Sequence, residues 1–270
     1  MLQILQYRFI QHAILASILG GATCGTVGVF VVLMRIPFVG VAMSHAAFAG
    51  AIFGLLTQTN PLAMAILFCL ASTSLIGPLA DRAEFDPNIS VGIIFSVVLG
   101  LAFLGMGLLK GPKTEALNLI WGNILLISKN DIILMAAVGA IILFILILLF
   151  KEVQAVLFNR EIARAVGINE KGIFYSLLFL TGVVVTLNLN TIGGLLIFSL
   201  IVNPPSAAYQ LTYSLKSMFL LSALFGVSSC LLGLVASYLF NVPSGAVIII
   251  VSSIIFLLAF AFSPKRRVKA

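Results

Sequence analysis

The sequence predicts an all-α polytopic membrane protein with 8–9 transmembrane helices. Hydrophobic residues make up 61% of the 270 residues and charged residues only 9%, whereas soluble domains carry about 25% charged residues. Apolar runs of about 20 residues, the length of a membrane-spanning helix, recur along the whole chain. The short alternating segments typical of a membrane β-barrel are absent, and no polar stretch is long enough for a soluble catalytic domain.

Nine apolar runs are the candidate spans. In order they are His12–Met34, Ile36–Leu56, Leu62–Ala80, Ile89–Leu109, Asp131–Phe150, Gly172–Leu187, Ile192–Tyr209, Lys216–Phe240 and Ala246–Phe262. The first run is rich in glycine, and small residues let membrane helices approach closely. The other runs are separated by charged residues, prolines or short polar turns. We expect each run to form a helix across the bilayer, with one of them in doubt as a full span.

The segments between the runs predict loops and breaks. Met1–Gln11 is mixed in character and fits a segment along the interface, and Asp81–Pro87 is a charged loop. Ala116–Ser128 is too short to cross, so it fits a re-entrant or interfacial piece. Asn188–Thr191 is a polar break. Asn203, Pro204 and Pro205 interrupt the seventh run, where two consecutive prolines remove two backbone donors and predict a broken or kinked helix.

Charge gives a partial orientation. The net charge is +7, and its clearest cluster is the C-terminal tail of Lys265, Arg266, Arg267 and Lys269. The positive-inside rule places this tail in the cytoplasm, and the charge is no nucleic-acid signal. Five runs precede Lys151–Lys171 and four follow it, which puts the N-terminus outside, unless one early run does not cross. The side of the N-terminus therefore stays open.

The three cysteines all lie in apolar runs, which favours buried small residues over metal ligands.

The polar stretch Lys151–Lys171 contains seven charged residues between two apolar runs, so it must lie in water. Asn159 is a good N-cap, the residues after it predict two helical turns, and Gly167 fits the position just past a helix end. Helical spacing places Ile162, Ala163 and Val166 on one face and Arg160, Glu161 and Arg164 on another. Two interpretations remain: an interfacial linker helix, or a helix that docks on a soluble partner.

His45 is the one ionisable residue deep inside a predicted span. It is either hydrogen-bonded to a neighbouring helix or a ligand or gate on a transport pathway, because intramembrane ionisable groups are costly and usually face a cavity. Neutral imidazole binds borderline transition metals well. One histidine cannot form a site alone, but a dimer would bring two together. Ser44 is adjacent in sequence, and Val41 lies one helical turn before His45.

Five segments, in order, resemble the permease subunit of the metal-ion ABC importers, which take up zinc, manganese or iron. They are Gly28–Ala46, Leu119–Asp131, Phe158–Ile168, Gly193–Ala208, and Asn241–Ala246 with Ser263–Arg266. The similarity extends from about residue 7 to residue 267. Each segment is a weak signal alone, and their order and spacing make the resemblance specific.

The resemblance implies a single transmembrane permease domain over residues 1–270 in the cytoplasmic membrane. Residues of about 158–168 would be the coupling helix that docks on a separate ATPase subunit, with Asn159, Glu161, Ile162, Ala163, Val166 and Gly167 in that contact. It also implies a second permease chain in a homodimer, an extracytoplasmic metal-binding protein and surrounding lipid. The cargo would be a divalent metal ion, with ATP on the partner subunit and no cofactor on this chain. The sequence has no Walker-type phosphate loop, so we expect a transporter subunit and not an enzyme.

One departure from the family concerns the pathway. The family has an aspartate four residues before the histidine, and this chain has Val41. The family also has an aspartate in the coupling motif and another before the last turn, and this chain has Asn159 and Asn241 at those positions. Hard ions such as Mn²⁺ prefer oxygen ligands, so the loss at residue 41 leaves open zinc, manganese, a softer metal or a chelate.

Two other function classes compete with the permease. The alternative is a secondary transporter or channel for metal ions or a chelate that needs no ATPase. It would require intramembrane carboxylates, which the predicted spans lack. An intramembrane enzyme would require paired catalytic groups within the bilayer.

Overall fold

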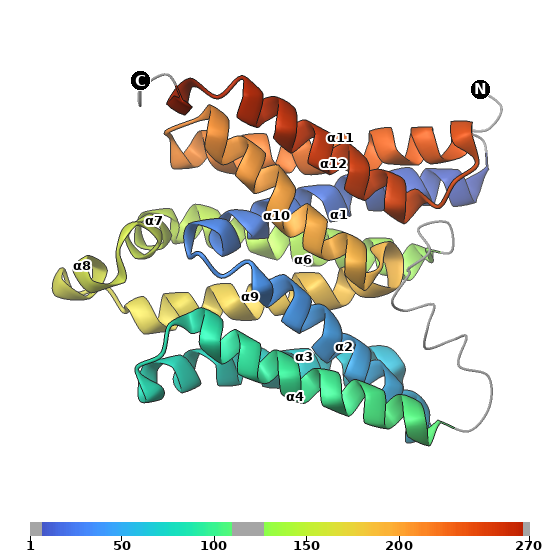
Figure 1. Cartoon of the computed structure of the whole chain (residues 1–270), viewed down its shortest axis with the longest axis horizontal. Helices are drawn as coiled ribbons and strands as arrows, with labels where there is room; N and C mark the ends of the chain where they lie inside the picture. Colours follow the sequence, from blue (N-terminus) through green and yellow to red (C-terminus); the bar gives the residue numbers. More distant parts are fainter. Residues whose placement is uncertain (1–6, 110–126, 267–270) are drawn as a thin grey trace.

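The computed structural model describes residues 7–109 and 127–266, and Figure 1 shows that they form a bundle of long helices. The helices are α1 (Arg8–Leu33), α2 (Phe38–Leu56), α3 (Pro61–Ala83), α4 (Pro87–Leu108), α6 (Lys129–Leu148), α7 (Phe150–Phe158), α8 (Arg160–Ala165), α9 (Glu170–Ile192), α10 (Gly194–Leu211), α11 (Leu215–Phe240), α12 (Ser244–Ala261) and the 3-10 helix η3 (Pro264–Arg266). Most of the large buried side chains belong to α1, α2, α9 and α10, which form the middle of the bundle.

Eight helices in the described part of the chain are long and apolar enough to cross a membrane: α1, α2, α3, α4, α6, α9, α11 and α12. Helix α10 has 18 residues and lies among them, but it contains the polar Asn203–Ser206 segment. The predicted all-α membrane fold with 8–9 spans is therefore confirmed. The predicted re-entrant piece Ala116–Ser128 lies outside the described residues, except that Ile127 is buried and Ser128 caps α6.

Side-chain caps set several helix ends. The Asn60 carboxamide accepts hydrogen bonds from two backbone amides of the first turn of α3, and the Asp86 carboxylate accepts one from the Asn88 amide of α4. Both caps precede a proline at the first helical position, where the missing N–H has no cost. Ser128 and Asp131 form a capping box at the start of α6. Gly193 separates α9 from α10 with φ +95°, a backbone conformation that glycine adopts without strain.

Three predicted boundaries were wrong, each because the helix is longer than the apolar run. Helix α1 begins at Arg8, so Arg8–Gln11 is not a separate interfacial segment. Helix α3 includes Asp81 and Arg82, and Tyr175 of α9 donates a hydrogen bond of 2.7 Å to Asp81 that supports this last turn. Helix α9 continues through Asn188, whose side-chain amide donates to the Val184 carbonyl one turn earlier. A polar side chain satisfied within its own helix does not end it.

The helix is not broken at Pro204 and Pro205. Helix α10 runs without interruption from Gly194 to Leu211, and the break lies before it at Gly193. A proline pair leaves two carbonyls without their usual donors, and neighbouring helices in a membrane protein cover such sites. Here Gly28 of α1 packs directly against the Ile201 carbonyl and the Pro205 ring. Tertiary packing therefore keeps the proline segment helical.

Glycine sets the close contact between α1 and α11, as the small residues of the first span predicted. A Cβ added to Gly21 would lie 2.6 Å from the carbonyl oxygen of Gly226. One turn along, a Cβ at Gly25 would lie 2.5 Å from the Ser222 carbonyl oxygen. The Ser222 hydroxyl also donates a hydrogen bond of 2.6 Å to the Gly25 carbonyl. The backbones of α1 and α11 are thus in direct contact at this crossing, and neither helix can make room for a larger side chain by a local movement.

We therefore expect Gly21→Ala to destabilise the bundle by about 1–3 kcal/mol, because overpacking forces the two helices apart. The melting temperature of the purified protein in detergent measures this. Gly100→Ala on α4 is the matched control, because no atom lies within 4 Å of the added Cβ. That change should leave the melting temperature equal or slightly higher. An unchanged melting temperature for Gly21→Ala would show that the α1–α11 crossing is not tightly packed.

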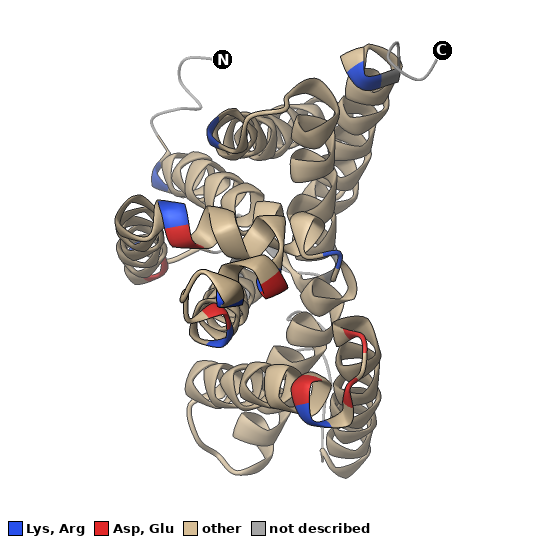
Figure 2. Cartoon of the chain, turned by 90° about the vertical axis from the view of Figure 1, so that its left-hand side faces the viewer, with Lys and Arg blue, Asp and Glu red and all other residues tan. Residues whose placement is uncertain are grey.

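Among the described residues, most Lys and Arg residues lie at one end of the bundle. Figure 1 shows the α1–α2 and α3–α4 connections, α7, α8 and η3 at one end, and the start of α1 at the other. Figure 2 looks onto the α8 end, where the ribbon positions of the charged residues lie at helix ends and connections. Arg35, Arg82, the basic residues of Lys151–Lys171 and Lys265 all belong to this end. The positive-inside rule therefore makes it the cytoplasmic end, and α1 begins on the opposite side.

Candidate functional site

Helix α8 is a short helix that projects from the cytoplasmic end between α7 and α9 (Figure 1). Asn159 caps it, and its side-chain oxygen accepts hydrogen bonds from the amides of Glu161 at 2.8 Å and Ile162 at 3.0 Å. At the other end Gly167 has φ +84°. The Gly167 amide donates to the Arg164 carbonyl, and the Ile168 amide donates to the Ala163 carbonyl. This pair of bonds is a Schellman motif, so the predicted cap and the predicted glycine stop are both confirmed.

The apolar side chains of α8 do not share one environment, contrary to the helical-face prediction. Ala163 is buried with 1% exposure, whereas Ile162 is 52% and Val166 is 67% exposed. Phe158, at the end of α7, is 81% exposed at the same end of the molecule. The prediction of one shared apolar face is wrong, because Ala163 packs against the bundle while Ile162 and Val166 are exposed. We call Phe158, Ile162 and Val166 the apolar tip.

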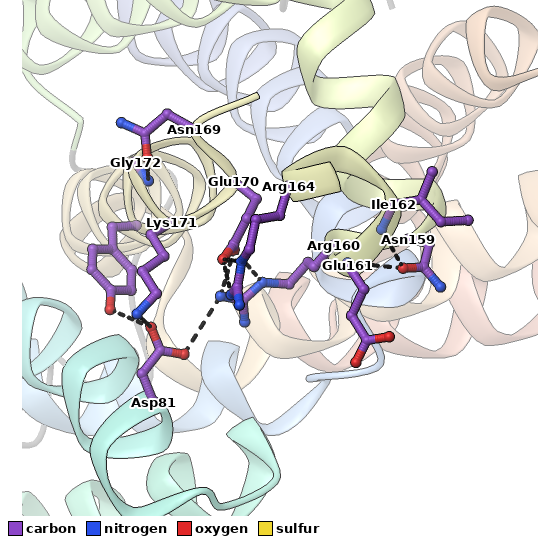
Figure 3. Close-up of polar contacts among 11 residues, drawn as sticks. Asp81, Asn159, Arg160, Glu161, Ile162, Arg164, Asn169, Glu170, Lys171 and Gly172 are labelled. Carbon is purple, nitrogen blue, oxygen red and sulfur yellow. Dashed lines mark hydrogen bonds and ion pairs between the residues drawn. The ribbon is translucent and has the colours of Figure 1, made fainter. Parts of the chain in front are cut away.

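Two arginines of α8 bind one buried carboxylate (Figure 3). Glu170 begins α9, and its side chain is only 2% exposed. Arg160 donates from Nε to Glu170 Oε2 at 2.8 Å and approaches the same oxygen with Nη2 at 2.7 Å. Arg164 donates to the other oxygen through Nε at 3.1 Å and through Nη2. The Arg160 guanidinium also lies 4.2 Å from the centre of the Phe174 ring. Both carboxylate oxygens are therefore occupied.

The cluster extends to a third helix through Asp81, near the end of α3. Arg160 Nη2 lies 3.5 Å from Asp81 Oδ1, and Lys171 Nζ lies 3.3 Å from Oδ2. Tyr175 donates its hydroxyl proton to the same Oδ2 at 2.7 Å. We call these six residues, Asp81, Arg160, Arg164, Glu170, Lys171 and Tyr175, the ionic clamp. It joins α8 to the cytoplasmic ends of α3 and α9.

The sequence interpretation placed Arg160 and Arg164 on a charged face and did not pair them with Glu170 or Asp81. A signal was present, since a chain with so few charges places two arginines and a glutamate within eleven residues. The hydrogen bond from Arg164 to Glu170, and the charge of that carboxylate, raise the pKa of Arg164 above its ordinary value. Glu161 points away from the clamp (Figure 3). It is the acidic residue of α8 that remains available to a partner.

His45 is half-buried in α2 and is oriented by its own helix. Its Nδ1 lies 2.9 Å from the Val41 carbonyl oxygen, and its ring meets Phe95 of α4 edge to face, with 5.2 Å between ring centres. A carbonyl only accepts, so Nδ1 carries a proton, and in the neutral imidazole Nε2 then has the free lone pair. This is the tautomer in which a histidine binds metal through Nε2. The hydrogen bond is therefore to a carbonyl of its own helix and not, as predicted, to a neighbouring helix, and it is compatible with a ligand role.

The predicted pathway residue Ser44 and the predicted helix-break residue Asn203 lie in different surroundings. Ser44 is buried and donates to the Gly40 carbonyl at 2.9 Å, close to Gly194 at the start of α10. Asn203 donates to Ser252 at 3.0 Å and Ser253 at 3.1 Å on α12. The proline segment therefore faces α1 and α12.

No group of three or more His, Cys, Asp and Glu side chains close enough to hold a metal occurs in residues 7–109 and 127–266. Cys24, Cys69 and Cys230 are free thiols and are buried, as predicted for small apolar residues. Within the described part, His45 therefore belongs to no such group, and a complete metal-coordination shell around it would need donors from elsewhere.

Comparisons with known proteins agree on one group. A model of the ABC 3 transport family matches residues 6–263. The chain is 31% identical over 266 residues to the manganese transport system membrane protein MntC of Halalkalibacterium halodurans, which covers 98% of this chain and 91% of that protein. It is 30% identical over 261 residues to the manganese import system permease protein ScaB of Streptococcus gordonii, with coverage of 97% and 94%. Among solved structures, a chain of PsaBC from Streptococcus pneumoniae in complex with Fab superposes with a TM-score of 0.85 at 30% identity and covers 97% of this chain and 94% of that one.

Proposed function

Because this chain belongs to the ABC 3 transport family, we propose that it is the permease subunit of an ATP-driven importer for a divalent metal ion, with manganese as the first candidate. The observation that carries the proposal is identity of about 30% over nearly the full length to proteins named as manganese permeases. Zinc and iron are the other candidate ions. The whole chain acts as one permease domain in the cell membrane, and ATP is hydrolysed by a partner.

The docking partner is an ATPase subunit, and α8 is the coupling helix that contacts it. The apolar tip of Phe158, Ile162 and Val166 is exposed at the cytoplasmic end, and an amphipathic helix of this kind fits a groove on a partner. Asn159 and Gly167 set the two ends of the helix, and Glu161 supplies a charge beside the tip. Two such chains in a homodimer, two ATPases and an extracytoplasmic metal-binding protein complete the importer. ATP-driven movement of α8 then changes which side of the membrane the pathway faces.

The cargo passes His45, with Ser44 and Val41 in the same segment of α2. The Nε2 atom of His45 is oriented as a metal ligand by the bond from Nδ1 to the Val41 carbonyl. A second copy of the chain would supply a second histidine. Transient binding by few ligands suits a pathway, where an ion must leave as well as enter.

The proposal is tested by reconstituting the chain in liposomes with its ATPase and metal-binding protein and measuring ATP hydrolysis and metal uptake. We expect Mn²⁺ to stimulate both, more than Zn²⁺ or Fe²⁺ does. Uptake without the ATPase would instead identify a secondary transporter or channel, which is the competing function. Stimulation by a chelated metal and by no free ion would retain the ABC architecture and reject the free ion as cargo.

Val41→Asp should shift the preference among metals further towards Mn²⁺. The substitution places a carboxylate one helical turn before His45, and hard ions prefer oxygen ligands. The measurement is the ratio of Mn²⁺ to Zn²⁺ uptake at equal concentrations. Val41→Asn is the matched control, because it has the same shape without the charge. An unchanged ratio in Val41→Asp would show that residue 41 does not face the cargo.

A further inference from the structure

The ionic clamp ties α8 to the centre of the bundle and not to its edge. Helix α9 is largely buried and packs against α1, α2, α3 and α10, whereas α6, which precedes α7 and α8 in the chain, faces mostly outward. Figure 1 shows α9 in the middle of the bundle. Glu170, the first residue of α9, holds both Arg160 and Arg164 of α8. A force on α8 is therefore applied to a central helix through charge-assisted bonds, which are the strongest hydrogen bonds in proteins.

Helices α3 and α9 form one tightly packed pair beyond the clamp. The Tyr175 ring lies against Gly77, leaving no room for a Cβ, and its hydroxyl reaches Asp81 one turn later. Further along, a Cβ at Gly182 would lie 2.8 Å from Cγ2 of Thr73. Close packing of this kind resists sliding of one helix along the other. The pair should move as a unit.

At the end away from the ionic clamp, the interface between α3 and α9 contacts α2, the helix that contains His45. The Cys69 thiol of α3 donates to the Gly182 carbonyl of α9 at 3.3 Å. The same sulfur lies 3.6 Å from the sulfur of Met43 in α2. Met43 is two residues before His45 and is fully buried. A continuous series of contacts thus leads from α8 through α3 and α9 to α2.

We propose that Glu170 is the positioning residue that fastens α8 to the α3–α9 pair, so that movement of α8 by the ATPase is passed through this pair to α2 and the cargo pathway. The inference rests on the proposed function and adds the route by which the ATPase acts on the pathway. Glu170 touches neither ATP nor metal. Its bonds to the two arginines set the position of α8, and Asp81 extends the connection to α3.

The test is Glu170→Gln in the reconstituted complex, with Mn²⁺ uptake and ATP hydrolysis measured in the same liposomes. Glutamine keeps the size of the side chain and removes the charge that both arginines bind. We expect Mn²⁺ transported per ATP hydrolysed to fall by about tenfold, as loss of one member of a coupling network does, while the ATPase remains bound. An unchanged ratio would overturn the proposal. A purely structural role would lower the yield of complex and leave the ratio in the remaining complexes unchanged.

A second variant keeps the test valid if Glu170→Gln folds poorly. The Arg164 side chain is 64% exposed, so Arg164→Gln removes one arm of the clamp with little risk to folding. The ratio should fall, and the double variant should be no worse than Glu170→Gln alone, because both changes disable one device. If the ratio of Mn²⁺ transported to ATP hydrolysed falls in the double variant by the product of the two single effects, the two residues act separately, and the proposal is overturned.

Glu84→Gln is the matched control, because Glu84 is an exposed carboxylate at the same end and forms no ion pair in the described part of the chain. It should leave the ratio unchanged. The wild-type complex separates the two hypotheses. If it shows no ATP-dependent Mn²⁺ uptake, the proposed function fails. If the wild-type complex transports Mn²⁺ and Glu170→Gln has the same ratio of Mn²⁺ transported to ATP hydrolysed, only the inference about the ionic clamp fails.

Discussion

Ile162→Glu should release the ATPase subunit while leaving the membrane bundle folded. Ile162 is 52% exposed in the isolated chain, so a glutamate there stays in water and costs the fold little. In the complex the same side chain would enter the partner's groove, where burying an unpaired charge is strongly unfavourable. We expect the affinity of the ATPase to fall by about 2–4 kcal/mol, the range of an interface hot spot. Titration of the ATPase onto the chain in nanodiscs measures the affinity.

Gln154→Glu is the control for added charge. Gln154 is exposed on α7 near the same end and does not belong to the apolar tip. This variant should bind the ATPase as the wild type does. If Ile162→Glu also binds normally, the apolar tip is not the contact surface. Ala163→Glu is unsuitable for this purpose, because Ala163 is 1% exposed and its replacement would disturb the packing of α8 itself.

The spans were predictable because an apolar run needs about 20 residues to cross as a helix, whatever its neighbours. Helix ends were less predictable because contacts far apart in sequence decide them. Asp81 belongs to α3 since Tyr175, which is 94 positions away, binds its carboxylate. The proline pair remains helical since α1 packs against it, and no local rule contains that information. Sequence patterns describe one helix at a time.

The same limit applies to the site. Asn159 and Gly167 were predictable, because an N-cap and a glycine stop act within one turn of their own helix. The clamp was not, because Arg160 meets Asp81 across 79 positions and only after α8 folds back onto α9. The inward direction of Ala163 has the same origin. A helical wheel gives the faces of α8, but the clamp decides which face meets the bundle.

His45→Ala should reduce Mn²⁺ uptake per molecule by about 10–100-fold or more, since loss of even an outer-shell partner costs a metal site that much. Folding should be little affected, because the bond that His45 makes is to the Val41 carbonyl of its own helix. Uptake in liposomes, normalised to the amount of folded protein and ATPase, measures the effect. ATP hydrolysis without metal should stay at the wild-type rate, which separates loss of the pathway from loss of docking.

His12→Ala is the control for removing a histidine. His12 lies on α1, and its Nδ1 is 3.2 Å from the Ile127 carbonyl. It belongs to neither the clamp nor α2, so uptake per molecule should not change. If His45→Ala also transports normally, His45 only occupies space beside Phe95. In that case the cargo must be held by groups outside α2, since the ring nitrogen of His45 is the one strong metal ligand that the predicted pathway segment Val41–His45 contains.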